Sequence, residues 1–371
     1  MQSVQIHSVV RSFGATTAVA GVSFTVKQGQ LTVLLGPSGC GKSTMLRMIA
    51  GLDEPTSGTI EIGGRNVAGM TGAARGVAMV FQSYALFPHL SVADNIAFGL
   101  SVRGVPKKEI AERLAKTTRL LGLEALLYRK PGQLSGGQQQ RVALGRALIA
   151  QAPVCLLDEP LSNLDAQLRQ DLRREIRALQ QRLGITMIYV THDQTEAMSM
   201  ADEVILMRAG RIEQHGAPAE LYDRPASLFT ARFIGGAPMS FLDLDDGVNG
   251  AVIAGTHGPA LFSGSGKGRV LGLRPEDVTV DRVNGAAKIH AVVTAVEYLG
   301  GEALLTCIAA GKPILARVRG KDVPDIGVSV GLSWPPSAAH IFDAGDGTRI
   351  SADPFPNDRP NLHAVTHAVS N

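Results

Sequence analysis

The chain has 371 residues, of which 45% are hydrophobic and 19% charged, so it holds about two globular domains and is not a disordered protein. The net charge of +3, without a block of five or more Lys or Arg residues, argues against a nucleic-acid-binding protein. Three distant cysteines, Cys40, Cys155 and Cys307, indicate free thiols and no zinc site. The N-terminus does not resemble a signal peptide, and no run of about 18 apolar residues occurs. We therefore expect that any membrane task requires a partner that spans the bilayer.

The first part of the chain predicts strands that alternate with helices. LTVLL is a continuous apolar run, as expected of a strand buried on both faces, and a Gly-rich loop and the helix-like stretch KSTMLRMIAG follow it. A longer helix is predicted over 165–183 from its apolar spacing. This alternation predicts a mostly parallel sheet flanked by helices. The predicted strands cover 4–10, 18–26, 31–35, 59–62, 77–81, 154–157 and 185–191.

Between about residues 83 and 150 the pattern becomes helical, which predicts a helical subdomain inserted into the α/β core. SVADNIAFGL begins with Ser91 and Asp94, a pair that indicates a capping box. PKKEIAERLAKTTRLLG has apolar residues at helical spacing and ends at Gly122. A third helix is predicted to begin just after LSGG and to continue through RVALGRALIA.

From about Gly235 the chain predicts a small all-β domain, over 235–350. GGAP interrupts the chain, and the strand-like runs RVLGLRP, AKIHAVVTAVEYL, ALLTCIA, PILARV and SVGLSW follow. GLRPEDVTV and GLSWPPSAAHIF weakly repeat each other, which suggests a duplicated β unit. The polar stretch 351–371 is expected to be a loose tail. The expected domains are therefore 1–234 and 235–350, followed by this tail.

GPSGCGKST matches the phosphate-binding pattern GxxxxGK[ST] in its required place, after a buried strand and before a helix. Glycines let backbone N–H groups turn toward phosphate oxygens, and the next helix presents its N-terminus to the same anion. Lys42 would add a positive charge for the outer phosphates, and Ser43 a hydroxyl for Mg²⁺. The alternative is a Gly-rich turn with a chance lysine. We predict an ATP site made of Gly36, Pro37, Ser38, Gly39, Cys40, Gly41, Lys42, Ser43 and Thr44.

VCLLDEP is an apolar strand that ends in two acids, Asp158 and Glu159. Asp158 would hold Mg²⁺, and Glu159 would polarise the attacking water as general base. Such a pair standing alone would more simply be two solvated acids. Beside a phosphate loop it indicates phosphoryl transfer, which needs both a metal site and a positioned nucleophile.

LSGGQ places Ser135, Gly136, Gly137 and Gln138 at the start of a predicted helix, which gives a second anion-binding N-terminus. One nucleotide rarely needs two such sites within one chain. A capped helix with a Gly-rich entry is the structural alternative.

The phosphate loop, LSGGQ and LLDEP, in this order, resemble the nucleotide-binding subunits of ABC transporters, and the resemblance extends through almost the whole chain. It implies that Gln82, in VFQSYALFPH, senses Mg²⁺ and the membrane partner, and that Asp165, in LSNLDAQLR, faces a twin subunit. It implies that His192, in YVTHDQTEA, contacts the γ-phosphate and acts with Lys42 and Glu159 in catalysis. Phe13, in RSFG, would stack on adenine. A core or turn aromatic and a structural histidine are the alternatives for Phe13 and His192.

The resemblance also implies an assembly. Two copies would pack head to tail, with ATP between the phosphate loop of one copy and LSGGQ of the other, and hydrolysis would open the dimer. The opening would move two transmembrane permease subunits that dock near YALFPHLSVADNIAFG and that receive solute indirectly from a solute-binding protein. The chain would lie peripherally on the cytoplasmic face of the inner membrane and bind no nucleic acid.

VFQSYALFPHLSVADNIAFGL and DEPLSNLDAQLR resemble importers of sugars and sugar phosphates, of the maltose and glycerol-3-phosphate type. GLRPEDV and SAAHIFDAGDGTRI resemble their C-terminal domain, an OB-like β module for dimerisation and regulation. IFDAGDGTRI is closer to the glycerol-3-phosphate type. The implied fold is an α/β P-loop NTPase of the ABC type followed by this all-β domain. The chain departs from the family at Ser240 and Gln139, where Asn and Arg are usual.

The resemblance favours an importer of sn-glycerol-3-phosphate or a related carbohydrate over other functions. Ferric-ion and polyamine importers have similar ATPases and β modules, so they remain the main alternative. A soluble ABC protein of ribosomes or DNA would carry two cassettes, or a long coiled coil between Lys42 and Ser135, and neither is present. Exporters commonly fuse the ATPase to membrane helices. Regulation by partners of 235–350 would be a second role rather than a competing one.

Overall fold

The chain divides into two units, the first ending at Leu221 and the second beginning at Tyr222. The boundary expected after residue 234 lies about a dozen residues farther along, because the short helix that contains Ala231 packs within the second unit. The expected tail, 351–371, lies outside the described residues. No helix in the described part of the chain is both long and apolar enough to cross a membrane. The computed structural model describes residues 2–256, 258–282, 287–320 and 323–350.

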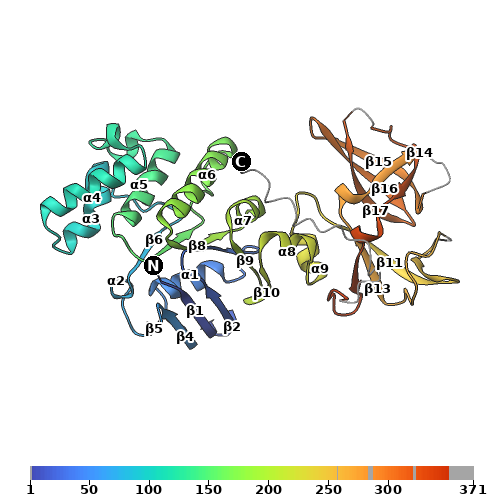
Figure 1. Ribbon diagram of the computed structural model, residues 1–371, viewed down its shortest axis with the longest axis horizontal. Helices are drawn as coiled ribbons and strands as arrows, with labels where there is room; N and C mark the ends of the chain where they lie inside the picture. The colour runs from blue at the N-terminus through green and yellow to red at the C-terminus, as the bar shows by residue number, and fades with distance from the viewer. Residues whose placement is uncertain (1, 257, 283–286, 321–322, 351–371) are drawn as a thin grey trace, which may run out of the picture. The chain divides into compact units, whose positions relative to one another are not determined.

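A six-stranded sheet, in the order β10-β9-β3-β8-β7-β6, forms the centre of the first unit (Figure 1). All neighbouring strands in it are parallel except β10 and β9. Every residue of β3 and β8 is buried, which explains why both strands are largely apolar in the sequence. The mostly parallel sheet predicted from the alternating pattern is thereby confirmed. The strands are β3 (Leu31–Leu35), β6 (Val77–Val80), β7 (Val154–Asp158), β8 (Thr186–Thr191), β9 (Glu203–Arg208) and β10 (Arg211–Gly216).

A second, antiparallel sheet of the first unit has the order β2-β1-β4-β5. It shares one core with the central sheet and with helix α1 (Lys42–Ala50), because Met45 and Ile49 are buried in the same cluster as Val4 of β1 and Val190 of β8. The sequence predicted three of these strands but not their separate sheet, since pairing depends on contacts far apart in the chain. The strands are β1 (Val4–Phe13), β2 (Thr16–Val26), β4 (Ser57–Ile62) and β5 (Arg65–Asn66).

The predicted helices between about 83 and 150 are present, and their apolar faces form one cluster that includes Ile96, Leu134 and Val142. Ser91 accepts a hydrogen bond from the amide of Asp94 and so caps the first helix. The full capping box is not formed, because the short Asp94 carboxylate accepts from the Ser91 hydroxyl instead of the Ser91 amide. The helices are α3 (Val92–Val102), α4 (Lys107–Leu120) and α5 (Gly136–Leu148).

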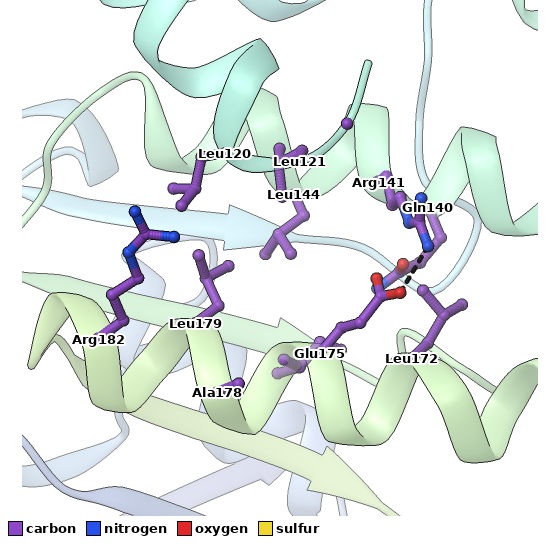
Figure 2. A pocket seen from close by; sticks show the side chains of 12 residues that line it. Leu120, Leu121, Gln140, Arg141, Leu144, Leu172, Glu175, Ala178, Leu179 and Arg182 are labelled. Carbon is purple, nitrogen blue, oxygen red and sulfur yellow. Dashed lines mark hydrogen bonds and ion pairs between the residues drawn. The ribbon is translucent and has the colours of Figure 1, made fainter.

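Helix α6 (Ala166–Leu183) is amphipathic and buries Leu172, Ile176 and Leu179. Asp165 caps its first turn by accepting a hydrogen bond from the amide of Leu168. A cavity remains where this helix faces α5 and the end of α4 (Figure 2). The shorter helices are α2 (Gly72–Arg75), α7 (Gln194–Met200), α8 (Pro218–Asp223) and α9 (Leu228–Phe233).

The second unit is built on two antiparallel sheets, β12-β11-β13-β19 and β14-β18-β15-β16-β17. One apolar core joins them, in which Leu271 of the first sheet lies with Leu305 and Leu332 of the second. The all-β prediction is confirmed, although β11, β12, β14 and β19 were not predicted as strands. The strands are β11 (Ser240–Gly247), β12 (Gly250–Ile253), β13 (Arg269–Leu273), β14 (Thr279–Arg282), β15 (Ile289–Tyr298), β16 (Glu302–Ala309), β17 (Lys312–Arg319), β18 (Ser329–Ser333) and β19 (His340–Asp343).

The two weakly repeated strings adopt the same order of elements. GLRPEDVTV forms the end of β13, the 3₁₀ turn η3 (Pro275–Asp277) and β14, whereas GLSWPPSAAHIF forms β18, the turn η4 (Pro336–Ala338) and β19. Strand β13 pairs with β19 and β14 pairs with β18. Each repeat therefore begins in one sheet and ends in the other, so the two repeats connect the sheets.

Arg274, which follows β13, is a buried cation at this junction, with only 2% of its surface exposed. Its guanidinium donates to the carbonyl oxygens of Ile234 and Tyr222, at 2.8 and 2.7 Å, and lies 3.7 Å from the centre of the Tyr222 ring. Burial lowers the pKa of Arg274 to about 10, so the side chain remains charged at neutral pH. Its guanidinium thereby supplies hydrogen-bond donors to two backbone carbonyl groups near the start of the second unit.

We expect Arg274→Met to destabilise the protein by about 2–4 kcal/mol, because it leaves these two carbonyls without donors. Thermal unfolding followed by circular dichroism would show a lower Tm. Arg319→Met, at an exposed position of β17, is the matched control and should unfold like the wild type. Equal midpoints for both variants would show that Arg274 does not support the second unit.

Candidate functional site

The expected catalytic residues lie where the parallel strands of the central sheet end. The phosphate loop follows β3, Asp158 ends β7, and His192 follows β8 directly. The register pairs Leu35 with Thr191 and Asp158 with Val190, so these three strands end side by side. The carboxyl edge of a parallel sheet is the usual place for ligands in such folds.

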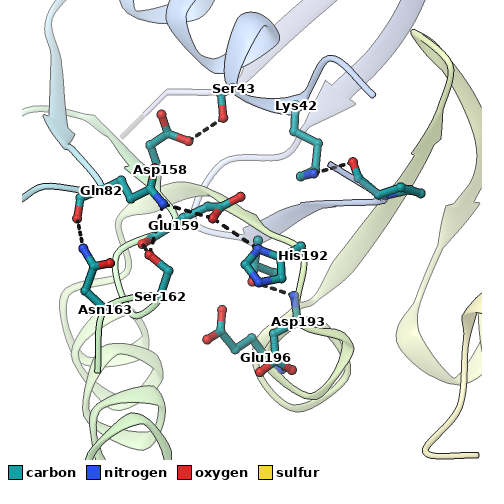
Figure 3. Close-up of polar contacts among 12 residues, drawn as sticks. Lys42, Ser43, Gln82, Asp158, Glu159, Ser162, Asn163, His192, Asp193 and Glu196 are labelled. Atoms are coloured by element: carbon teal, nitrogen blue, oxygen red, sulfur yellow. Dashed lines mark hydrogen bonds and ion pairs between the residues drawn. The ribbon is translucent and has the colours of Figure 1, made fainter. Parts of the chain in front are cut away.

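The conformation of the phosphate loop depends on its glycines. Gly36 and Gly41 have φ of 151° and 104°, and a Cβ atom there would lie 2.3 Å from the carbonyl oxygen of Met207 and 2.4 Å from that of Ala18. Lys42, the first residue of α1, is almost fully buried and folds back over the loop. Its Nζ donates to the carbonyl oxygens of Gly36 and Pro37, at 2.8 and 2.9 Å (Figure 3).

The predicted metal-binding pair is in direct contact. The hydroxyl of Ser43 donates to Oδ1 of Asp158 at 2.8 Å (Figure 3). Burial raises the pKa of Asp158, and the nearby charge of Glu159 adds to this effect. The Ser43 hydrogen bond and the positive charges of Arg47 and Lys42 oppose it. The site thus holds a carboxylate that is partly removed from water.

Glu159 has a φ of 43°, in the left-handed region that non-glycine residues rarely occupy. Its N–H donates to the carbonyl of Val190 at 3.0 Å, which holds this conformation against β8. Its Oε2 lies 3.1 Å from Nδ1 of His192 and 3.5 Å from Nε2 of Gln82 (Figure 3). The structure therefore brings together three residues that the sequence predicted separately.

LSGGQ forms the start of α5, as predicted, with Ser135 as the cap. The amide of Gln138 donates to the Ser135 hydroxyl, and the amide of Ser135 donates to Oε1 of Gln138 at 3.0 Å. The glycines allow close packing, since a Cβ at Gly136 or Gly137 would lie within about 3 Å of leucine side chains. In the described part of the chain, no hydrogen bond connects Ser135 or Gln138 to the phosphate loop. One chain therefore does not bring its two predicted anion sites together.

Known proteins share this arrangement of motifs. Residues 19–162 match the family model for the ABC transporter, and residues 271–342 match that for the TOBE domain. The chain is 47% identical to the sn-glycerol-3-phosphate import ATP-binding protein UgpC of Rhodopseudomonas palustris (strain BisA53), over 94% of this chain and 100% of that protein. This chain belongs to the ATP-binding subunits of ABC transporters. It is therefore an ATPase coupled to transport, with an ABC-type P-loop fold and an OB-like β domain.

Two further proteins help to place this ABC subunit. The trehalose/maltose import ATP-binding protein MalK of Thermococcus litoralis is 45% identical over 94% of this chain and 100% of its own length. The ATP-binding cassette MJ0796, in its dimeric post-hydrolysis state bound to ADP and Pi, is 30% identical with a TM-score of 0.52. That structure covers 58% of this chain and 98% of its own.

Two predicted nucleotide-binding residues of the ABC subunit do not touch the residues around Glu159. Phe13, at the end of β1, is 48% exposed and stacks under the guanidinium of Arg11, 4.4 Å from the ring centre. The side chain of Asp165 caps α6, as described above. Their roles toward adenine and toward a second copy therefore stay predictions.

Three residues around Gln82 were missed by the sequence analysis. Ser162 accepts a hydrogen bond from Nε2 of Gln82 at 3.3 Å, and Asn163 donates to the Gln82 carbonyl at 3.1 Å (Figure 3). The third, Arg146 of α5, donates at 2.7 and 2.6 Å to the carbonyls of Tyr84 and Ala85. Tyr84 and Ala85 both have positive φ, so this loop is strained and Arg146 holds it. In the sequence, the position of Ser162 and Asn163 within the string LSN was the only feature that could have indicated a role at this site.

We expect Arg146→Met to lower the rate of ATP hydrolysis about tenfold, because the loop that presents Gln82 would lose its two charged donors. Binding of ATP should remain close to that of the wild type, since the phosphate loop is untouched. Phosphate release and fluorescent-nucleotide binding measure these two quantities. Arg129→Met, at an exposed position, is the control. Unchanged hydrolysis in Arg146→Met would mean that the loop keeps its conformation without Arg146.

Proposed function

We propose that this ABC subunit hydrolyses ATP to energise import of sn-glycerol-3-phosphate or a related carbohydrate. The contact between Glu159 and His192 beside the phosphate loop supports hydrolysis most directly. The named relatives support the solute, since seven of them are sn-glycerol-3-phosphate import proteins at 45–47% identity. Trehalose or maltose is the second candidate, because the MalK protein is 45% identical over an equal share of the chain.

The geometry supports specific tasks for the residues of this site. Lys42 would exchange its two loop carbonyls for the outer phosphate oxygens of ATP. Glu159 would take a proton on Oε2 from the attacking water, whose oxygen bonds to the γ-phosphorus as the bond to the leaving ADP oxygen breaks. His192 is 55% exposed and reaches Oε2 of Glu159, so its ring can orient the carboxylate and contact the γ-phosphate.

The chemistry of the donors fits Mg²⁺. Ser43 and Asp158 offer hard oxygen ligands in direct contact, and Gln82 offers an amide oxygen nearby. No cluster of three or more His, Cys, Asp or Glu residues that could hold a metal occurs in the described part of the chain. Mg²⁺ is commonly bound by one or two protein ligands together with substrate phosphates, and this site has that form. When bound, the ion would neutralise charge on the phosphate oxygens.

The LSGGQ end of α5 supports a second copy of the chain as partner. Ser135 and Gly136 are exposed, and neither is bonded to the phosphate loop of its own chain. The similar cassette MJ0796 is dimeric. We infer that two copies pack head to tail and complete each other's ATP sites. We also propose that two permease subunits dock near α3 and that a solute-binding protein supplies them with solute. The chain would then lie on the cytoplasmic face of the inner membrane.

We expect Glu159→Gln to lower ATP hydrolysis at least about 100-fold, because the amide cannot accept the proton from water. ATP should still bind, and the variant should form a stable dimer with ATP and Mg²⁺, visible by size-exclusion chromatography with light scattering. Glu112→Gln, an exposed position of α4, controls for loss of one charge. Normal turnover in Glu159→Gln would remove Glu159 as the base.

The solute can be tested with a complete complex, made from this chain and its proposed permease and solute-binding partners. In proteoliposomes, sn-glycerol-3-phosphate should raise ATP hydrolysis several-fold, and trehalose, maltose, spermidine and ferric ion should not. Stimulation by trehalose or maltose alone would favour the second candidate. A response only to spermidine or ferric ion would reject a carbohydrate solute while leaving the ATPase role intact.

A further inference from the structure

A cavity of about 330 Å³ lies between the end of α4, the middle of α5 and the middle of α6 (Figure 2). Its volume falls within the range of known small-molecule pockets, roughly 300–1,000 Å³. It is separate from the residues of the ATP site. The lining residues come from all three helices and include Leu120 of α4, Gln140, Arg141 and Leu144 of α5, and Glu175 and Arg182 of α6.

The walls of the cavity are mainly apolar. Leu144, Leu172 and Ile176 are almost fully buried, and Leu120 and Leu121 complete the upper side in Figure 2. Such a surface favours a ligand with an apolar body, since burying apolar area gains roughly 25 cal/mol per Å². Apolar walls alone would not select any particular ligand.

Gln140 is the residue of the cavity wall that would discriminate between ligands. Its side chain is fully buried, yet neither its amide nitrogen nor its amide oxygen has a hydrogen-bond partner in the described structure. An unpaired buried amide is costly, and native proteins keep few such groups without a reason. The amide can both donate to and accept from one hydroxyl group. A ligand with such a group would supply the missing partner.

Charged side chains lie at both ends of the cavity in Figure 2. At one end, Arg141 and Glu175 form an ion pair at 2.6 Å, and both side chains are partly exposed. Exposed pairs of this kind contribute little to stability, so this part of the wall can open at small cost. At the other end, the guanidinium of Arg182 has no ion pair or hydrogen bond with any described residue. Arg182 is exposed, so its guanidinium can pair with a carboxylate at the mouth of the cavity, where water screens part of the attraction.

We propose that this cavity binds a small carboxylate with an apolar chain and a hydroxyl group. The carboxylate pairs with Arg182, the chain lies against the leucines, and the hydroxyl bonds to the Gln140 amide. Gln140 lies one turn after the LSGG residues that begin α5. A ligand that spans α5 and α6 therefore ties this part of the predicted ATP-binding surface to α6. This site goes beyond the proposed transport function and does not depend on it.

Titration calorimetry with the full-length chain and three probes tests the proposal. 8-Hydroxyoctanoate carries all three groups, octanoate lacks the hydroxyl, and 1,8-octanediol lacks the charge. Wild type should bind 8-hydroxyoctanoate most tightly. Arg182→Gln should weaken it about threefold and leave 1,8-octanediol unchanged, which also shows that the variant is folded. Arg174→Gln, on the exposed face of the same helix, is the matched control and should bind all probes like the wild type.

Gln140→Leu keeps the volume of the side chain and should remove the preference for 8-hydroxyoctanoate over octanoate, a loss of about fivefold. Hydrogen exchange should slow in α5 and α6 when 8-hydroxyoctanoate binds. The proposal is overturned if 8-hydroxyoctanoate does not bind, if both variants bind it like the wild type, or if protection appears outside α4, α5 and α6.

Discussion

The ATP site depends on one constraint, the parallel pairing of β3, β8, β7 and β6. Parallel strands in register end at the same edge, so the phosphate loop, Asp158 and His192 become neighbours although they are far apart in the chain. The backbone hydrogen bond from Glu159 to Val190 extends this register one residue beyond β7. It holds Glu159 at positive φ and turns its side chain toward His192. The strain is stable because β8, which pairs with β7 beside Glu159, is fully buried and cannot shift.

Helix α5 connects this edge with the helical region. Its first turn contains LSGG, its second turn begins near Gln140, and Arg146 farther along holds the loop after Gln82. A rotation of α5 would therefore change three places together: the exposed LSGGQ residues, the cavity wall and the position of Gln82. Since a helix is stiff over this length, coupling between them needs no unfolding. Through Arg146, α5 thus connects the loop after Gln82 with LSGGQ within one chain.

The sequence predicted what local pattern controls and missed what depends on distant contacts. Buried strands and the Gly-rich loop were recognisable because apolar runs and turn residues act over a few positions. The acids after β7 gained meaning only from the phosphate loop, and His192 and Gln82 gained theirs from the family resemblance. Arg146 gave no signal, because it bonds to backbone carbonyls of Tyr84 and Ala85, which any residue can present. For the same reason the second sheet and Arg274 were not foreseen.

In the free chain, the groups predicted to bind phosphate already bond to one another. Lys42 is satisfied by the carbonyls of its own loop, and Ser135 and Gln138 satisfy each other at the start of α5. ATP must exchange these bonds for new ones, and such an exchange gains little in net free energy. The larger gain has to come from placing the negative γ-phosphate against several positive groups at once. The start of α5 would add a second phosphate-binding element, which one chain does not bring to its own phosphate loop. The self-satisfied free state therefore agrees with the proposed head-to-tail pairing, in which a second copy would supply the further contacts to ATP.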